Sequence, residues 1–408
     1  MTPSHLQPLP WMTAPEPAAV FQTLESAGAQ VRFVGGCVRD SLVGRPVNDV
    51  DIATDAEPVR VMALMQAAGF KTIPLGVDHG TVMVVVDGES FEITTLRRDI
   101  DTDGRRATVE FTDDWDADAA RRDLTFNALS LEVDGTIHDP FDGVADLHAG
   151  RVRFVGDATT RIQEDFLRLL RYYRFFAHYG RPPSDSDARA ACRALAPNVE
   201  RLSGERIRAE LFKLLAAPDP GPVLDMMRDD GVLRHVIQVE GNIERVARLV
   251  AVEAKMNLAD PARRLFALLS LESDELRAAA RRLRLSNAER DFLPQLKENA
   301  GRLRVDVATA RLRHAIYRLG APLSRELALL GWADDGDEAG WRAILDVIDA
   351  WTSIALPVSG ADVLTLGVEH GEKVGALLRR VEEWWIVGDF KAGRDACLAH
   401  LAHLVSEG

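Results

Sequence analysis

The spacing of hydrophobic and polar residues changes near residue 150 of this chain. Before that point, short apolar runs alternate with breaks rich in Gly, Asp and Asn, a pattern typical of strands. The predicted strands cover residues 31–34, 50–53, 81–86, 91–95 and 129–133, and residues 59–68 have helical spacing. Beyond residue 150, Leu, Ala and Arg recur with helical spacing almost to the end. We therefore predict an α+β fold, with a mixed-sheet head followed by an all-helical remainder.

Clusters of Pro and Gly divide the helical remainder. They fall at residues 180–183, 218–221 and 336–340. We expect five segments: a loose N-terminal lead-in (1–20), a catalytic head (21–150), a helical neck (151–217), a helical body (218–335) and a helical tail (336–408).

Composition limits the class of protein. Of the 408 residues, 47 % are hydrophobic and 27 % charged, which is typical of a soluble globular chain. No apolar stretch reaches the roughly 20 residues of a membrane span, and no signal peptide is evident, so we expect no membrane association. Cys37, Cys192 and Cys397 have no zinc-site spacing and favour a cytoplasmic location. The net charge of −14 argues against nonspecific nucleic-acid binding, although a local basic groove remains compatible with it.

The first candidate site combines Gly35 and Gly36 with Asp49 and Asp51. The glycines would let the main chain approach a triphosphate where a helix begins. Asp49 and Asp51 alternate along a predicted strand and would face the same side. Two close carboxylates repel each other unless a cation lies between them, and Mg²⁺ prefers carboxylates plus substrate phosphates. Taken alone, the glycine pair could be an ordinary tight turn and the aspartate pair an exposed strand edge. The two halves together predict a nucleotidyl-transfer site.

A second cluster holds Arg121, Arg122, Asp123 and Asn127, directly before a predicted strand. Arginine offers a planar fork for phosphate, while Asp and Asn can hydrogen-bond ribose hydroxyls. The alternative is a capped helix with a solvent-exposed arginine pair.

A third cluster lies on a predicted helix over residues 164–175. Asp165, Arg168, Arg171 and Arg174 are three residues apart and would form a stripe. The stripe is either a surface ladder with a weak Asp165–Arg168 ion pair, or a set of hydrogen-bonding edges for a nucleobase. Three arginines on one face repel each other without a nearby anion, which favours the nucleobase.

Together these segments resemble the class II tRNA nucleotidyltransferases, that is, the CCA-adding enzymes and their poly(A) polymerase relatives. The resemblance covers most of the chain. The matching motifs are Gly35–Asp40 with Asp49 and Asp51, Arg121–Asp123 with Asn127, Asp139–Gly143, Glu164–Arg168, Ser203–Leu211 and, more weakly, Gly360–Leu364 with 367–375.

The resemblance implies a polymerase β-like nucleotidyltransferase head that adds CCA to the 3′ end of tRNA from CTP and ATP. Asp49 and Asp51 would hold two Mg²⁺ ions, and pyrophosphate would be released. Glu92 is either a third catalytic carboxylate or an ordinary strand residue. The expected nucleotide-binding residues are Gly35, Gly36, Arg39, Arg121, Asp123, Asn127, Asp165, Arg168, Arg171 and Arg174. No protein partner is evident.

Two segments favour full CCA addition within that family. Residues 75–81 lack the basic pair usual in the poly(A) polymerases, which favours CCA addition. Residues 97–120, with an expected tip at 99–106, form a loop of ample length, which favours addition of the final A. The alternatives are a poly(A) polymerase, a partial CC- or A-adding enzyme, a small-molecule nucleotidyltransferase and a non-catalytic RNA-binding protein.

Overall fold

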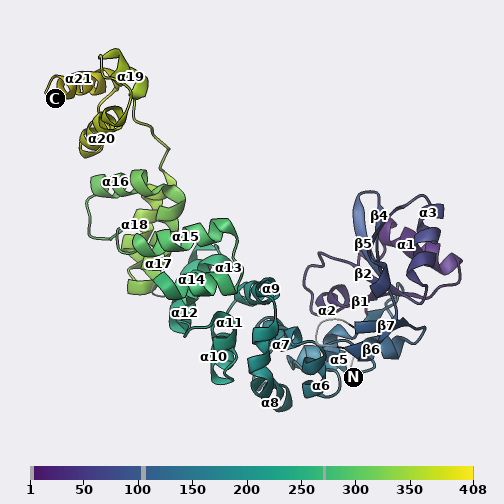
Figure 1. Cartoon of the computed structure of the whole chain (residues 1–408). Helices are drawn as coiled ribbons and strands as arrows, with labels where there is room; N and C mark the ends of the chain where they lie inside the picture. Colours follow the sequence, from purple (N-terminus) through teal and green to yellow (C-terminus); the bar gives the residue numbers. More distant parts are fainter. Residues whose placement is uncertain (1–3, 103–106, 270–272, 408) are drawn as a thin grey trace. The chain divides into compact units, whose positions relative to one another are not determined.

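The computed structural model describes residues 4–102, 107–269 and 273–407 (Figure 1). The chain forms two compact units. The first is Met1–Gly241 with Ala278–Leu285, and the second is Asn242–Arg277 with Ser286–Gly408. No helix in the described part of the chain is long and apolar enough to cross a membrane.

A seven-stranded mixed sheet forms the head of the first unit. Its order is β3-β4-β5-β2-β1-β8-β9. The strands are β1 (Val31–Val34), β2 (Asp51–Thr54), β3 (Lys71–Gly76), β4 (Thr81–Val86), β5 (Glu89–Thr95), β8 (Ser130–Leu131) and β9 (Ile137–His138). Only the β2–β5 pair is parallel among these strands. The predicted α+β class with a mixed sheet is therefore confirmed.

Two helices pack on the sheet and close the core of the head. Helix α1 (Pro15–Ser26) and helix α3 (Pro58–Ala67) contact each other, and both contact strand β4. Phe21 and Leu24 of α1 and Met65 of α3 are buried together with Phe33 and Ile52 of the central strands. Burying such side chains gives about 1.5–3 kcal/mol each, so this layer fixes the positions of β1 and β2.

Helix α2 (Gly36–Leu42) follows β1 directly and lies near the short turn η2 (Thr125–Asn127) and helix α5 (Gly143–Ala149). Gly143 is required there, because a Cβ atom would lie 2.3 Å from the Thr125 carbonyl oxygen. This close approach holds the residues after the Arg121–Asp123 segment against the head.

Residues 97–120 are not the loop that we expected. Strands β6 (Arg97–Thr102) and β7 (Ala107–Phe111) form a two-stranded sheet, and helix α4 (Trp115–Ala120) follows. Strand β6 begins with three consecutive charged residues, 97–99, so its sequence lacks the apolar alternation that marks a strand. The expected loop tip at 99–106 falls partly outside the described residues.

The N-terminal segment also differs from the expected loose lead-in. The Leu6 amide donates to the Gly135 carbonyl oxygen at 2.8 Å, and the Ile137 amide donates to Ser4 at 3.0 Å. Met12 is fully buried in the core of the head, and the Trp11 indole donates to Ser41 at 3.2 Å. Residues 4–14 therefore pack on the head before α1 begins.

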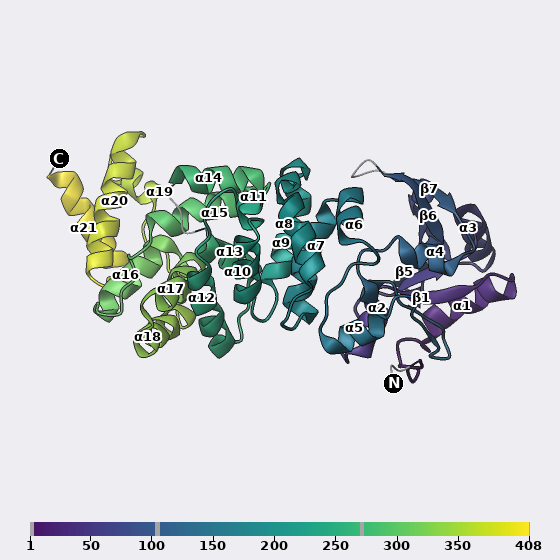
Figure 2. The ribbon, with the colours of Figure 1, turned by 90° about the horizontal axis from the view of Figure 1, so that it is seen from below.

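Helices make up the rest of the first unit, and α7 packs along α9 (Figure 2). They are α6 (Ala158–Glu164), α7 (Leu167–Tyr179), α8 (Ser186–Leu195), η3 (Ala196–Arg201), α9 (Gly204–Leu215), α10 (Gly221–Asp229) and α11 (Leu233–Ile237).

The second unit is helical throughout its described residues, as expected. Its helices are α12 (Ile243–Met256), α13 (Pro261–Leu268), α14 (Ser273–Arg282, whose C-terminal half belongs to the first unit), α15 (Asn287–Glu298), α16 (Thr309–Leu319), α17 (Ala321–Asp335), α18 (Glu338–Asp349), α19 (Gly360–Thr365), α20 (Glu372–Val387) and α21 (Arg394–Ser406). The expected boundaries between neck, body and tail stay a prediction.

Candidate active site

The glycine turn between β1 and α2 brings the main chain beside a carboxylate. Gly35 has a φ of +72°, which favours glycine strongly. A Cβ atom there would lie 3.6 Å from both Asp51 Oδ2 and Arg122 Nη1. The turn, the acidic strand and the arginine segment therefore meet at one place in the head.

Three acidic residues lie at this edge of the sheet. Asp51 is the first residue of β2 and pairs with Glu92 on the parallel strand β5. Asp49 precedes the strand in an exposed segment, so its predicted place on the strand is wrong. The strand begins one residue later than predicted, because only Asp51 and the residues after it pair with β1.

Burial, reinforced by the charges of Glu92 and Asp49, raises the pKa of Asp51, while Arg122 opposes the shift. A cation would relieve this repulsion. Within the described ranges, no three acidic, His or Cys side chains form a preformed metal cage. The carboxylates therefore suit a cation that takes its other ligands from phosphates and water, as Mg²⁺ does.

The alternative explanation required a solvent-exposed Arg121–Arg122 pair, but both side chains are mostly covered. Both guanidinium groups bind Asp118, which is buried on α4: Arg121 Nη2 lies 2.6 Å from Oδ1 and Arg122 Nη2 lies 3.1 Å from Oδ2. Arg122 also donates to the Asn127 carbonyl oxygen at 3.3 Å. The pair is thus held rigidly at the edge of the site.

Asp123 connects this segment to helix α7. Its Oδ1 accepts from Asn127 Nδ2 at 3.0 Å, and its Oδ2 accepts from Arg171 Nε at 2.5 Å. Burial acts to raise the pKa of Asp123, but the charge and hydrogen bond of Arg171 outweigh it and lower the pKa to about 2. Protein donors already occupy both carboxylate oxygens, so Asp123 positions Arg171 and Asn127, and its contact with a ribose stays a prediction.

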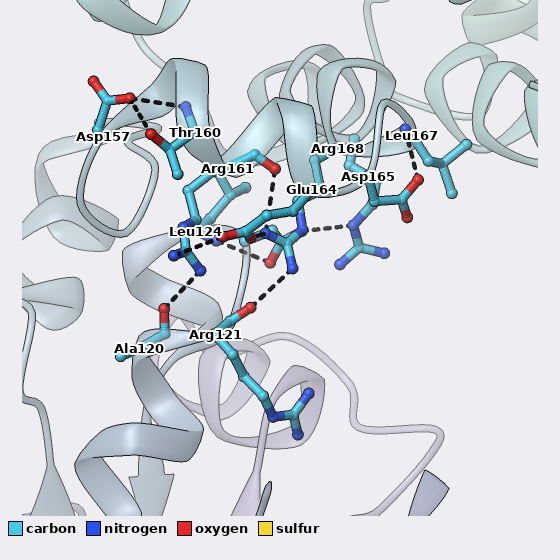
Figure 3. A network of polar contacts seen from close by, with 12 residues as sticks. Ala120, Arg121, Leu124, Asp157, Thr160, Arg161, Glu164, Asp165, Leu167 and Arg168 are labelled. Atoms are coloured by element: carbon cyan, nitrogen blue, oxygen red, sulfur yellow. Dashed lines mark hydrogen bonds and ion pairs between the residues drawn. The ribbon is translucent and has the colours of Figure 1, made fainter. Parts of the chain in front are cut away.

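The predicted continuous helix over residues 164–175 is wrong. Helix α6 ends at Glu164, Asp165 is extended (φ −152°, ψ 110°), and α7 begins at Leu167. Asp165 Oδ1 accepts from the Leu167 amide at 3.1 Å (Figure 3). Its Oδ2 accepts from Arg206 of α9 at 2.6 Å. The carboxylate therefore binds the amide of the first residue of α7 and is held in place by Arg206.

Arg168 pairs with Glu164 and not with Asp165, so the ion pair of the surface-ladder alternative does not form. Its guanidinium also donates to the carbonyl oxygens of Arg161 at 3.2 Å and of Arg121 at 2.9 Å (Figure 3). Arg168 thereby ties the start of α7 to the arginine segment of the head.

The other two arginines of the stripe also have acidic partners. Arg171 binds Asp123, and Arg174 Nε lies 3.0 Å from Glu210 of α9. Burial lowers the pKa of Arg174 to about 10 despite this partner. Protein carboxylates therefore supply the anions, and repulsion among the arginines is no longer an argument for a bound nucleotide.

Arg39 completes the group. Its Nη1 donates to Asn127 Oδ1 at 2.8 Å, and its guanidinium lies over the rings of Tyr179 (4.6 Å) and Phe175 (5.0 Å) on α7. All the expected nucleotide-binding residues thus belong to the first unit, and hydrogen bonds or ion pairs join most of them.

Sequence reasoning missed three residues that hold this arrangement. Asp118 lies three and four residues before Arg121 and Arg122, a spacing that would have indicated the clamp. Arg206 lies in a segment quoted only as a motif, and nothing in the chain pattern pairs Tyr179 with Asp40, because that contact spans 139 residues.

Comparisons with known proteins agree with this geometry. The family described as "Poly A polymerase head domain" matches residues 31–153, and "Probable RNA and SrmB- binding site of polymerase A" matches residues 185–239. The chain is 34 % identical over 383 residues to the mitochondrial CCA tRNA nucleotidyltransferase 1 of Danio rerio, covering 91 % of this chain and 87 % of that protein.

Bacterial relatives extend the similarity. The CCA-adding enzyme of Leuconostoc citreum is 32 % identical, with 95 % of each chain covered. The crystal structure of the Bacillus stearothermophilus CCA-adding enzyme in complex with CTP superimposes with a TM-score of 0.81 at 30 % identity, covering 96 % of this chain and 97 % of that one. With its site geometry and near full-length similarity, this chain belongs to the CCA-adding tRNA nucleotidyltransferase family.

Proposed function

We propose that the protein adds C, C and A to the 3′ end of tRNA, using CTP and ATP and releasing pyrophosphate. The observation that carries the proposal is the similarity to CCA-adding enzymes along almost the whole chain, including one solved with CTP. The site adds a physical reason, because acidic, arginine-rich and glycine-turn segments meet in one unit.

Mg²⁺ is the cofactor that we assign to Asp49 and Asp51. The raised pKa of Asp51 beside Glu92 and Asp49 indicates an acidic cluster that a hard cation would stabilise. When bound, such ions lower the pKa of the attacking hydroxyl and neutralise phosphate charge.

The chain's own residues would do the rest. The Gly35–Gly36 turn leaves room for the triphosphate, and Arg39 and Arg122 place positive charge beside it. The tRNA 3′ oxygen attacks the α-phosphorus, and the bond to pyrophosphate breaks. Holding the two reactants in line provides most of the rate enhancement in such reactions.

Base choice belongs to Asp165 and Arg168. Asp165 can accept a hydrogen bond from an exocyclic amine, and Arg168 can donate to ring nitrogens or a carbonyl. Their partners Arg206, Glu164 and the Arg121 carbonyl fix both side chains before any nucleotide binds. A protein edge of fixed shape would thus replace a template strand.

A primer-extension assay tests the proposal. With tRNA lacking CCA, CTP alone should add two residues, and CTP with ATP should add three and then stop. A long homopolymer from ATP alone would identify a poly(A) polymerase, and arrest after CC would identify a partial enzyme.

Variants test the metal-binding residues in the same assay. Asp49→Asn and Asp51→Asn should each lower incorporation of both nucleotides by more than about 10²-fold while tRNA still binds. Asp87→Asn is the matched control, because Asp87 is an exposed acid in a turn of the same sheet. Near-normal rates in either active-site variant would overturn the metal assignment.

A cytoplasmic location is also part of this proposal. It rests on the three cysteines, which are buried free thiols.

A further inference from the structure

A closed ring of polar contacts joins the glycine-turn helix α2 to helix α7. From α7, the Tyr179 hydroxyl donates to Asp40 Oδ1 at 2.5 Å. Asp40 accepts from Arg39 at 3.1 and 2.9 Å, and Arg39 donates to Asn127 at 2.8 Å. Asn127 donates to Asp123, which accepts from Arg171, back on α7.

The ring fixes α7 at two places. Arg171 and Tyr179 are eight residues apart, which is about 12 Å along a helix. A helix held at one point can pivot about it, whereas two anchors this far apart prevent tilting. The two anchors, together with the bond from Arg168 to the Arg121 carbonyl oxygen, hold Arg168 at a set distance from Asp51.

The Tyr179 anchor is the more specific of the two. Its ring lies under the guanidinium groups of Arg39 (4.6 Å) and Arg45 (4.2 Å), so stacking holds the ring in place. The Tyr179 hydroxyl donates a short hydrogen bond to the Asp40 carboxylate. A bond to a charged acceptor is among the stronger hydrogen bonds in proteins.

We propose that Tyr179 and Asp40 form a positioning pair that sets the alignment of the base-reading helix with the catalytic carboxylates. The inference rests on the proposed nucleotidyl transfer and deepens it. The pair has no contact with the base edge formed by Asp165 and Arg168. Its loss should therefore slow chemistry without changing which base is chosen.

Helix α7 contains its own controls, because it carries three tyrosines with different hydroxyl partners. The Tyr179 hydroxyl binds Asp40 of the head, and the Tyr173 hydroxyl binds Asp230, directly after α10, at 2.9 Å. The Tyr172 hydroxyl is buried and has no hydrogen-bond partner among the described residues. Replacing each by Phe removes one oxygen atom from the same helix.

The experiment measures kcat and KM for CTP and ATP with tRNA primers, together with thermal stability. Tyr179→Phe should lower kcat for both nucleotides by about ten-fold, since misplacement by about 1 Å is enough for such a loss. KM should stay within about two-fold, and discrimination against UTP and GTP should not change. Tyr172→Phe should match the unmodified protein in kcat, KM and nucleotide choice, and it should be at least as stable, because a buried hydroxyl without a partner is removed.

Tyr173→Phe separates positioning from stability. It removes a hydrogen bond that is more deeply buried than that of Tyr179, so it should lower the melting temperature at least as much, without the loss in kcat. If Tyr173→Phe lowers kcat as much as Tyr179→Phe does, or if Tyr179→Phe has normal kcat, the positioning pair is wrong.

A double-mutant cycle completes the test. Asp40→Ala and the Asp40→Ala/Tyr179→Phe double variant should have the same kcat, because the Tyr179 hydroxyl has no carboxylate left to bind once Asp40 is replaced. Additive losses would overturn the pairing. An unmodified protein that extends no tRNA primer would instead overturn the proposed function, so the two failures are distinguishable.

Discussion

At the scale of single residues, the base-reading edge that we propose for Asp165 and Arg168 depends on geometry more than on charge. Arg168 bonds Glu164 and two main-chain carbonyl oxygens, from Arg161 and Arg121. A planar guanidinium can satisfy all three partners at once, whereas an ammonium group cannot hold the same directions. A positive charge at position 168 is therefore not enough to fix the direction of the hydrogen bonds that the side chain offers to a base.

Arg168→Lys should raise misincorporation of UTP and GTP by about ten-fold or more, because one good bidentate contact gives about 1–3 kcal/mol of discrimination. The total rate with CTP should fall less. Competition among all four nucleotides measures this. Arg228→Lys, an exposed arginine on α10, is the control and should leave the choice unchanged. Unaltered selectivity in Arg168→Lys would remove Arg168 from the edge.

Asp123 leads to a prediction about acid stability. Its pKa of about 2 lies below the ordinary 3.8, so the folded protein favours the charged form. The resulting stabilisation, of order 2 kcal/mol, is complete above about pH 4 and is lost as the pH falls toward 2. Urea unfolding should show that the stability gap between wild type and Asp123→Asn narrows from pH 6 to pH 3. A gap independent of pH would mean that the Asp123–Arg171 pair adds no such stabilisation.

At the scale of elements, the apolar pattern located the central strands well. Residues 31–34 and 81–86 are strands as predicted, because each is a short valine-rich run next to a glycine. The pattern failed where tertiary contacts decide. Asp165 interrupts the helix because its carboxylate accepts hydrogen bonds from the Leu167 amide and from the Arg206 side chain. No Gly or Pro marks this break in the sequence.

The residues of the candidate site were also predictable only where they lie close together in the sequence. Segments rich in Gly, Asp and Arg were found because their chemistry is local in sequence. Their partners were not found, since Glu210 and Tyr179 belong to helices that meet the site only in the folded chain. A sequence pattern has no record of such distant pairings.

Helix α7 is also held on the side away from the head. The Asp230 carboxylate is fully buried and accepts from Tyr173, from Arg189 at two positions (2.8 Å each) and from Arg193 at 2.8 Å. Asp230→Asn should lower the free energy of unfolding by about 2–3 kcal/mol, because buried donors lose a charged acceptor. Denaturant unfolding checks this value.

Asp229→Asn is the control, because the neighbouring carboxylate is 63 % exposed and its ion pair with Arg228 should contribute little. Equal effects of the two substitutions would show that the buried cluster has no special role in supporting α7.

At the scale of the whole molecule, the net charge of the chain is negative although the candidate site is rich in arginine. The chain carries a net charge of −14, yet the arginines around the candidate site are concentrated in the first unit. Arg121, Arg168, Arg171 and Arg174 each have an acidic partner there. Little uncompensated positive charge remains at the site to attract RNA without regard to its shape.

This balance predicts selective RNA binding. Nonspecific affinity for nucleic acid comes mainly from phosphate neutralisation, which an acidic protein with paired arginines provides poorly. At 150 mM salt, a hundred-fold mass excess of poly(U) should therefore leave CTP incorporation into tRNA within about two-fold of its uninhibited rate. Unlabelled tRNA lacking CCA at the same excess should suppress incorporation of label almost completely. Equal inhibition by the two RNAs would show that the protein binds phosphate backbones generally, and that its acidic surface does not restrict the choice of RNA.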